Sequence, residues 1–564
     1  MMRSALLQSS ILRRLRGTVA ACGLILALTP VMSSANDFCP NVYDTGVFNL
    51  DFNPAFLHID EFDADDGEIY DGLIVTSFFN AIKDNTGARI GYFERDLVAR
   101  IEGIGYRSPA WFKADRDVEV ISDQDLASPV IPRAQGQTIW PNEAQRVPDG
   151  VLPFEAIVVP EGFHVTFEPG RLTLIDLDDP NRQTYLIHQS LQEGDGRCKL
   201  PSHSKFDPLV QPRFYHIVKW FDMDNDGLRD AVTVRSGFKV QGKVCLDAAG
   251  EVVWFKNPGA GIDPNVEWEE NIVVGYPTDP YGADISMDIF DFEGDGVPEI
   301  VGTNFFNGSA ISIYGAPVGD TWADVDPTTN PARNTQINTG NGEPFNVRIV
   351  DLNGDGSMDV LATNHQGDNC FAGITLDPNP GRVYAIEQPA SGDLFNDPWP
   401  EHILKDNIRP NPTYPTPASG PGRLGPGLAQ PFWFSAVKEA QGRKPWILVG
   451  GDEASKVWVL KPNSEDANDW NYLSSVIFDI NDYYGANTTQ SFTAPAPSGG
   501  TSISTIGQPD WRYDRGWAWA SYAEVYIPVF EGRAIHRISF RPRPDGTGQI
   551  VCPADGALAC PVTP

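Results

Sequence analysis

Acidic residues recur at alternate positions in one short stretch of this chain. The segment Asp222-Met-Asp224-Asn-Asp226-Gly-Leu-Arg-Asp230 places carboxylates at positions 1, 3, 5 and 9 of a loop, and Gly227 permits a sharp turn. Oxygen ligands of this kind suit a hard cation such as calcium, which takes about six to eight of them. The apolar run that begins at Ala231 has strand character. We therefore predict a calcium loop inside a β-hairpin.

The same nine-residue frame recurs before other strand-like runs. Good copies begin at Asp291 and Asp351, and a weaker copy begins at Asp63. Repetition before strands argues against an accidental acidic turn, so we predict calcium as a structural cofactor at about three strong sites and one weak site. The predicted ligands, which include the residue at position 7 through its carbonyl, are Asp222, Asp224, Asp226, Leu228, Asp230, Asp291, Glu293, Asp295, Val297, Glu299, Asp351, Asn353, Asp355, Ser357, Asp359, Asp63, Asp65 and Asp71.

The spacing of the frame predicts the fold. Strands at the equivalent place also occur near Ala156, Trp446 and Val525, where the acidic pattern is missing. The first frame position in the seven units is Asp63, Val147, Asp222, Asp291, Asp351, Lys438 and Gly516. Several units continue with an apolar strand, a turn and a strand led by Trp, as at Trp268, Trp399 and Trp470. Four short strands in each of seven units predict an all-β, seven-bladed β-propeller with calcium-binding hairpin loops. The segment Thr45–Leu50 is the candidate outer strand of the last blade.

These units resemble the FG-GAP/VCBS-type repeat family, whose calcium-looped blades also occur in integrin α-subunit propellers. The Asp-rich loop, the Val/Ile strand after it and the Trp-led strand carry the resemblance, over roughly residues 45–545. The resemblance implies a propeller with calcium in its inner hairpin loops. It does not imply one function, because the family includes adhesion receptors, lectins, polysaccharide lyases and a sugar dehydratase.

The N-terminal residues have the pattern of a secretory signal. Four arginines precede the apolar run Thr18–Met32, and Ser33-Ser34-Ala35 forms a small-residue cleavage site. We predict a signal peptide over 1–35, a propeller over 36–550 and a tail over 551–564. The protein is then exported, to the periplasm or the extracellular space, and the nearby pair Cys552 and Cys560 is the favoured disulfide.

Composition narrows the classes of partner. The formal net charge of −33 disfavours nucleic acid and anionic membranes. Nothing after the signal approaches the span of about 20 apolar residues that a membrane helix needs. We predict a monomer that binds a carbohydrate or another extracellular ligand.

Propeller geometry directs the search for chemistry to the face opposite the metal loops. Residues before the first strand and after the second strand of each blade should meet there, at what we call the mouth. The predicted ligand-binding residues are His58, Asn142, Asp284, Asn304, Asn346, Trp433, Asp452, Trp511 and Arg512. The candidate catalytic residues are Tyr215, His216, Arg235 and His365. Aromatic faces stack on sugar rings while acids, amides and arginines bond hydroxyl groups.

Two hypotheses of function remain open from the sequence. The first is a binding or adhesion module without turnover. The second is a carbohydrate-active lyase or dehydratase, in which Arg235 or Arg512 neutralises a uronate carboxylate while His216, Tyr215 or His365 moves a proton. Strand-end aromatics often pack between blades, and a lone His at a strand end is more often structural than catalytic. Whether this protein is an enzyme is therefore left open by its sequence.

Overall fold

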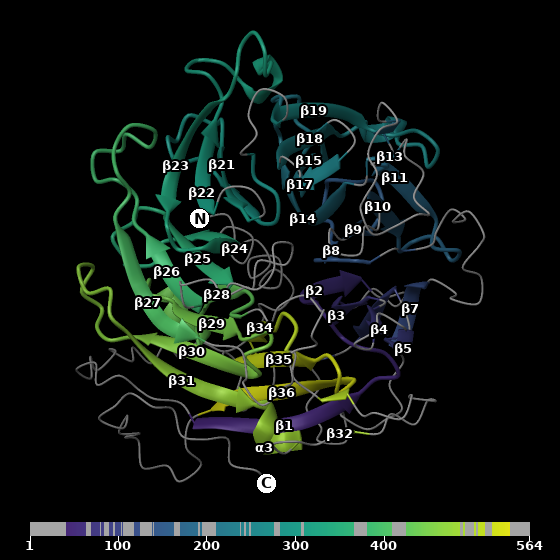
Figure 1. The fold of residues 1–564 in the computed structure, drawn as a ribbon, viewed down its shortest axis with the longest axis vertical. Coiled ribbons are helices and arrows are strands. Elements are labelled where there is room, and N and C mark those ends of the chain that lie inside the picture. Colours follow the sequence, from purple (N-terminus) through teal and green to yellow (C-terminus); the bar gives the residue numbers. More distant parts are fainter. Residues whose placement is uncertain are drawn as a thin grey trace, which may run out of the picture. The chain divides into compact units, whose positions relative to one another are not determined.

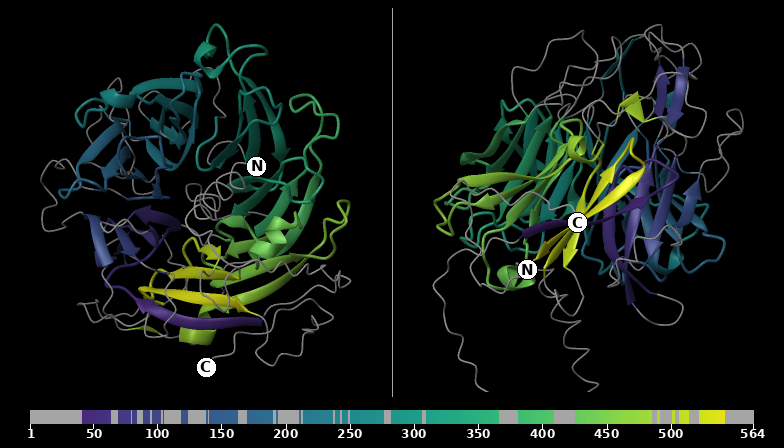
Figure 2. Two further views of the ribbon diagram at one scale, coloured as in Figure 1. Left: turned by 180° about the vertical axis from the view of Figure 1, so that it is seen from behind. Right: turned by 90° about the horizontal axis from the view of Figure 1, so that it is seen from below.

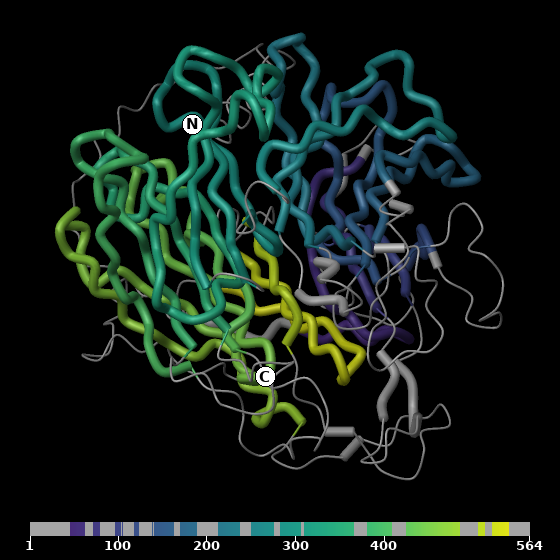
Figure 3. Tube along the Cα trace, turned by 45° about the horizontal axis from the view of Figure 1, so that its top comes forward, coloured from purple at the N-terminus to yellow at the C-terminus, as the bar shows by residue number. Residues whose placement is uncertain are grey.

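Seven four-stranded antiparallel sheets form this protein, whose structure is a computed structural model (Figure 1). The sheets follow one another in chain order around a ring, as the colours show in Figure 3. The predicted all-β, seven-bladed propeller is confirmed. The structure describes residues 41–63, 69–78, 80–83, 89–93, 96–102, 104, 118–123, 138, 140–162, 170–189, 192–193, 210–211, 213–236, 238–241, 244–247, 250–275, 282–305, 309–365, 381–408, 425–484, 489–490, 501–502, 506–513 and 522–541.

The blades are numbered here in chain order, and each is given from its innermost to its outermost strand. Blade I contains β2 (Leu57–Asp63), β3 (Ile69–Ser77), β6 (Leu97–Glu102) and β7 (Val118–Asp123). Blade II contains β8 (Gln145–Arg146), β9 (Ala156–Pro160), β10 (Arg171–Asp176) and β11 (Thr184–Gln189). Blade III contains β14 (Phe214–Phe221), β15 (Asp230–Ser236), β18 (Glu251–Lys256) and β19 (Glu269–Val274). Blade IV contains β20 (Met287–Phe290), β21 (Glu299–Asn304), β22 (Ala310–Gly315) and β23 (Arg333–Thr339).

Three further blades complete the ring. Blade V contains β24 (Glu343–Val350), β25 (Asp359–His365), β26 (Gly381–Ile386) and β27 (Glu401–Ile408). Blade VI contains β28 (Ala429–Phe432), β29 (Trp446–Gly450), β30 (Lys456–Pro462) and β31 (Tyr472–Asp479). Blade VII contains β34 (Asp510–Tyr513), β35 (Ala523–Val529), β36 (Ala534–Arg541) and β1 (Asn41–Asn49).

Small hairpins and short helices account for the other described elements. The hairpins are β4 (Asn80–Lys83) with β5 (Arg89–Phe93), β12 (Gln192–Glu193) with β13 (Val210–Gln211), β16 (Phe238–Gln241) with β17 (Val244–Asp247), and β32 (Thr489–Gln490) with β33 (Thr501–Ser502). The helices are α2 (Ala436–Ala440), α3 (Ile480–Tyr484), η2 (Gly259–Gly261) and η3 (Trp322–Asp324). In the described part of the chain, no helix is long and apolar enough to cross a membrane.

The two ends of the described chain close the ring together. Strand β1 pairs antiparallel with β36, so that Val42 lies opposite Phe540 and Val47 lies opposite His536. Figure 2 shows β1 in purple beside the yellow strands of blade VII. The predicted role of Thr45–Leu50 as the outer strand of the last blade is thereby confirmed. This pairing covers the edge of β36, which would otherwise be free to pair with another chain.

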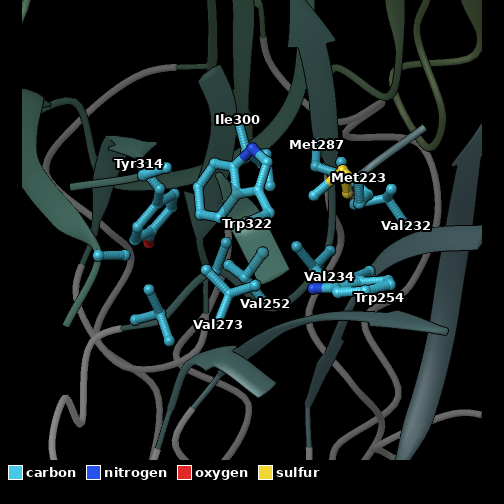
Figure 4. Packing of buried hydrophobic residues seen from close by; sticks show 14 of the residues in the cluster. Met223, Val232, Val234, Val252, Trp254, Val273, Met287, Ile300, Tyr314 and Trp322 are labelled. Carbon is cyan, nitrogen blue, oxygen red and sulfur yellow. The ribbon is translucent and has the colours of Figure 1, made fainter. Parts of the chain in front are cut away.

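The second strand of each blade carries most of the core. Every residue of β9, β15, β21, β25, β29 and β35 is buried, because neighbouring blades cover both faces of these strands. One apolar cluster joins blades III and IV through Val232, Val252, Met287 and Ile300. Figure 4 shows Trp322 from η3 within this cluster. Such continuous apolar burial explains why blades without acidic loops retain the same strand.

Several predicted features lie outside the described residues. These are the signal segment 1–35, the tail 551–564 with Cys552 and Cys560, and Asp65 of the weak loop. They remain predictions.

Trp322 provides a test of the packing between blades. Its side chain is 1% exposed, and its Nε1 donates to the Pro298 carbonyl at 2.8 Å. We expect Trp322→Ala to lower the free energy of unfolding by about 3–5 kcal/mol, because it leaves a cavity and an unpaired carbonyl. Denaturant unfolding measures this loss. The control Val318→Ala, at a side chain that is 85% exposed, should change little, and an equally small effect of Trp322→Ala would contradict the packing.

Candidate functional site

Three loops with one backbone geometry join the first two strands of blades III, IV and V. In each, the Asp at position 1 accepts the backbone N–H of position 6, from Gly227 to Asp222 at 2.9 Å, from Gly296 to Asp291 at 2.9 Å and from Gly356 to Asp351 at 3.0 Å. Positions 4 and 6 have positive φ in all three loops, which favours Asn and Gly. The residues concerned are Asn225, Gly227, Gly294, Gly296, Gly354 and Gly356.

The acid at position 9 anchors each loop to its blade. Asp230, Glu299 and Asp359 are buried, and each accepts the backbone N–H of position 2 at 2.9, 3.0 and 3.0 Å respectively. Burial, with the other loop carboxylates adding to it, raises the pKa of Asp230 to about 6, of Glu299 to about 8 and of Asp359 to about 7. Positions 1 and 5 of all three loops are half-buried or exposed, and a cation would be held beside them.

The donor set of blade III fits a hard cation. Asp222, Asp224 and Asp226 offer carboxylate oxygens that all lie within 4.8 Å of one another. The ammonium group of Lys256 contacts Asp224 and lies 3.1 Å from Asp226 Oδ2, so this loop carries a tethered cation that would compete with a metal ion. In blade IV, Arg333 lies 2.9 Å from Glu293 Oε2. Calcium at these loops remains a proposal.

The weak loop of blade I is engaged in a different interaction. The guanidinium of Arg512 binds Asp71 and lies 3.1 Å from Glu524 Oε2. Glu524 lies at the start of β35 and is paired with Arg512, so Arg512 lies at the loop end of blade VII. The prediction from the sequence, which placed Arg512 at the mouth, is therefore wrong. Asp71 therefore forms a bridge between blades I and VII. The side chain of Asp63 is not described.

At the mouth, aromatic and imidazole rings contact one another across the axis of the propeller. We call this set of rings the arch, and it consists of Phe530, Phe78, Phe56, His216, Phe345, His365 and Phe305. Successive ring centroids are separated by 5.0, 6.4, 5.4, 6.0, 3.7 and 5.7 Å. Trp140 stacks on Phe78 at 4.4 Å. Five blades contribute rings to the arch, and Trp140 adds a ring from blade II. Phe56, Phe78, Phe305 and Phe345 are only half-buried.

The two histidines of the arch differ in their surroundings. His365 is fully buried, and neither ring nitrogen has a hydrogen-bond partner among the described residues. Burial, and then the electrostatic influence of the neighbouring His216 imidazole, lowers the pKa of His365 to about 3, so the imidazole of His365 is neutral. His216 instead has its Nδ1 3.3 Å from Glu143 Oε1. The structure thus brings together two of the four candidate catalytic residues.

A layer of paired charges crosses the axis next to the arch. Glu143, which precedes β8 in blade II, lies 3.2 Å from Arg348 of blade V. Lys219 of blade III lies 3.0 Å from Asp288 of blade IV. Burial opposes ionisation of Glu143, but its contacts with His216 and Arg348 outweigh burial and hold its pKa at about 2. Because blades II and V are not neighbours, the Glu143–Arg348 pair spans the axis.

Tyr215 and Arg235 lie apart from the arch. The Tyr215 hydroxyl lies 2.6 Å from His188 Nδ1, and Arg235 Nε donates to Glu251 at 2.8 Å while its Nη1 contacts Glu270. Both side chains are fully buried in this network between blades II and III. Successive residues of a strand point to opposite faces, so Tyr215 and His216 enter different environments.

Most of the other predicted mouth residues bond to the backbone. Asn142 donates to the Gly162 and Tyr215 carbonyls at 2.8 and 2.7 Å. Asp284 accepts from Phe305 N at 2.7 Å, and Asn346 accepts from Ala429 N at 3.1 Å. Asn304 is fully buried at the end of β21. These residues lie at the mouth end of their blades and join strands together.

The remaining predicted residues divide between the two faces. Trp433 follows β28, so it lies on the loop side, where its Nε1 donates to Arg443 O at 3.0 Å. The sequence placed it at the mouth because the first strand of blade VI is shorter than the fixed frame assumes. Trp511 donates to Pro431 O at 3.0 Å within the interface of blades VI and VII. The side chain of His58 lies near the mouth and is 30% exposed, and its Nδ1 lies 3.9 Å from Asp510 Oδ2.

Comparisons with known proteins do not assign this chain. No family model matches it, so the FG-GAP/VCBS resemblance remains a prediction, and no curated protein matches it. Similar solved structures include a puromycin-hydrolyzing peptidase from Mycobacterium tuberculosis (12% identity, TM-score 0.33), of which this chain spans only 58% while 90% of this chain is covered. A second is a protein of unknown function from Dyadobacter fermentans, with 9% identity and a TM-score of 0.32; the match covers 89% of this chain and 100% of that one. A third is a rhamnogalacturonan lyase from Bacillus licheniformis, with 10% identity and a TM-score of 0.28; the match covers 89% of this chain and 91% of that one. TM-scores this low carry no argument about function.

Lys256 provides a test of the metal loop. We expect Lys256→Met to lower the melting temperature in excess chelator, because Asp222, Asp224 and Asp226 then repel one another without a cation. Added calcium should raise the melting temperature of the variant by more than that of the wild type, since an ion bound only by the folded state stabilises it. The control Lys438→Met, in α2, should respond to calcium as the wild type does. If calcium raises the melting temperature of neither Lys256→Met nor Lys438→Met, the metal site is contradicted.

Asp452 provides a test of charge at the mouth. Burial, with Glu531 adding repulsion, raises the pKa of Asp452 to about 7, above its value of about 4 in the unfolded chain. Because its pKa is higher in the folded state, Asp452 contributes its full stabilisation below pH ~4, and this contribution is lost as the pH rises through ~7. Asp452→Asn should therefore become more stable relative to the wild type between pH 5 and pH 8, as measured by denaturant unfolding. A difference that stays constant with pH would contradict the shift.

Proposed function

We propose that this protein is an exported, calcium-stabilised propeller that binds a carbohydrate at its mouth without turning it over. The observation that carries the proposal is the arch, whose rings contact one another across the mouth and include four phenylalanines that are only half-buried. Aromatic faces of this kind suit the apolar faces of sugar rings. His58, His216 and Asp452 supply donors and acceptors for hydroxyl groups around it.

The charges near the mouth favour a neutral sugar over a uronate. The two arginines that the sequence offered for a carboxylate are both held in ion pairs, Arg235 within blade III and Arg512 between blades VII and I. Arg348, which does reach the axis, is paired with Glu143. Acidic groups such as Asp452 and Glu531 remain near the mouth, and they would repel an anionic ligand.

Calcium has a separate, structural role in this proposal. Bound in the loops of blades III, IV and V, it would neutralise the carboxylates at positions 1 and 5, and at position 3 in blades III and IV, and hold each hairpin closed. The loops lie at the opposite ends of these strands from the arch. Membership of the FG-GAP/VCBS-type repeat family, export and a monomeric state are parts of the same proposal and rest on the sequence pattern.

A second candidate function is carbohydrate-active acid–base chemistry, as in a lyase or dehydratase. The contact between His216 and Glu143 favours it, because a carboxylate beside an imidazole is a common arrangement for proton transfer. Incubation with a panel of neutral and uronate polysaccharides separates the candidates. Binding without chemical change supports the module, whereas turnover that is lost in His216→Ala at an unchanged melting temperature supports the enzyme.

The arch can be tested by removing single rings. We expect Phe56→Ala and Phe345→Ala each to weaken binding of a neutral oligosaccharide roughly threefold to tenfold, as loss of one stacking contact worth about 0.5–1.5 kcal/mol implies. Isothermal titration calorimetry measures the affinity. The matched control is Trp470→Ala, which removes a ring stacked on His402 at the outer side of blade VI. Equal affinity in all variants, or an equal loss in the control, would contradict a binding site at the arch.

A further inference from the structure

We propose that Glu143 is the positioning residue of the mouth, which fixes the tautomer of His216 so that its Nε2 accepts a hydrogen bond from a hydroxyl group of the ligand. This inference rests on the proposed function, since it concerns the same site. It names a residue that the sequence pattern did not single out. It also narrows the ligand to a neutral molecule that donates a hydroxyl group at the floor of the mouth.

Glu143 is held from several sides. Its side chain is 6% exposed, its backbone N–H donates to the His216 carbonyl at 3.2 Å, and its Oε2 lies 3.2 Å from Arg348 Nη2. Its other carboxylate oxygen, Oε1, lies 3.3 Å from His216 Nδ1, a charge contact whose angles are not those of a hydrogen bond. The backbone contact and the side-chain contact therefore join the same two residues, which fixes the direction from which the carboxylate meets the imidazole.

The chemistry of the pair sets the position of the proton. An ionised carboxylate at 3.3 Å attracts the positive end of an N–H dipole, so the charge of Glu143 favours a hydrogen on the imidazole nitrogen that faces it. In the tautomer that carries its hydrogen on Nδ1, His216 presents the lone pair of Nε2 as an acceptor. The burial of the pair excludes water that would otherwise compete for both groups.

His365 is the histidine of the arch that has no carboxylate partner among the described residues. It belongs to the same set of rings, yet no described carboxylate pairs with it, whereas Glu143 lies against His216. Phe345 lies between the two imidazoles, with ring centroids 6.0 Å from His216 and 3.7 Å from His365. Only one histidine of the arch is therefore oriented by a charge.

Nitrogen-15 spectra of histidine-labelled protein test the positioning directly. The chain has eight histidines, and His216→Gln identifies the signal of His216. In the wild type we expect the shift pattern of an imidazole protonated at Nδ1, and in Glu143→Gln a shift toward the Nε2-protonated form, because an amide can also donate. An unchanged His216 signal in Glu143→Gln would overturn the proposal.

Two further variants separate positioning from a merely structural ion pair. Glu387→Gln makes the same substitution beside His402, whose Nε2 lies 2.8 Å from Glu387 Oε2, and should alter only the His402 signal. Arg348→Gln removes the other partner of Glu143 but keeps the carboxylate, so the His216 pattern should persist. If Glu143→Gln does not fold, Glu143→Asp is used in its place. In that case, a changed His216 pattern in Arg348→Gln would overturn the proposal.

Ligand affinity supplies the second readout. For a neutral oligosaccharide that binds the wild type, we expect Glu143→Gln to weaken binding about threefold to tenfold while Glu387→Gln leaves it unchanged. Equal affinity in Glu143→Gln would overturn the role in binding. If no oligosaccharide binds the wild type, the proposed function fails, whereas the tautomer of His216 still decides whether Glu143 positions it.

Discussion

Convergence of seven inner strands on one axis is the constraint on which the rest of this structure depends. Side chains from blades that are not neighbours are forced into contact there, as in the Glu143–Arg348 pair and the Phe56–His216 ring contact. Charges buried at such a place must be paired, since an isolated ion loses its hydration without compensation. Rings can fill the remaining space at no such cost. A layer of ion pairs and the arch follow from these two requirements.

The two ends of each blade have different chemistry because the same strands connect them. At one end, the position 9 acids Asp230, Glu299 and Asp359 are buried in the second strands and hold the loops in place. At the other end, the last residues of the second strands, such as His365, meet the arch. The loops can therefore stabilise the blades without taking part in recognition at the mouth.

The repeated loop pattern was sufficient to predict seven four-stranded blades and the closing strand β1, because local spacing determines the order of strands. It was insufficient for Trp433 and Arg512, since the inner strands differ in length: β14 has 8 residues, β28 has 4 and β8 has 2. To place Tyr215 and Arg235 correctly, the prediction would have had to include the pleat of their strands, which turns these side chains away from the axis. Glu143 and Arg348 gave no sequence signal, because their contact joins blades that are distant in the chain.

Amide hydrogen exchange with a bound neutral oligosaccharide tests the central claim, that recognition occurs at the mouth and not at the metal loops. The account predicts slower exchange at the mouth ends of inner strands, in residues 214–216 and 343–346, with no change in the loops 222–230 and 351–359. Calcium alone should give the reverse pattern. Protection of the loops by the oligosaccharide, with the mouth unaffected, would contradict the account.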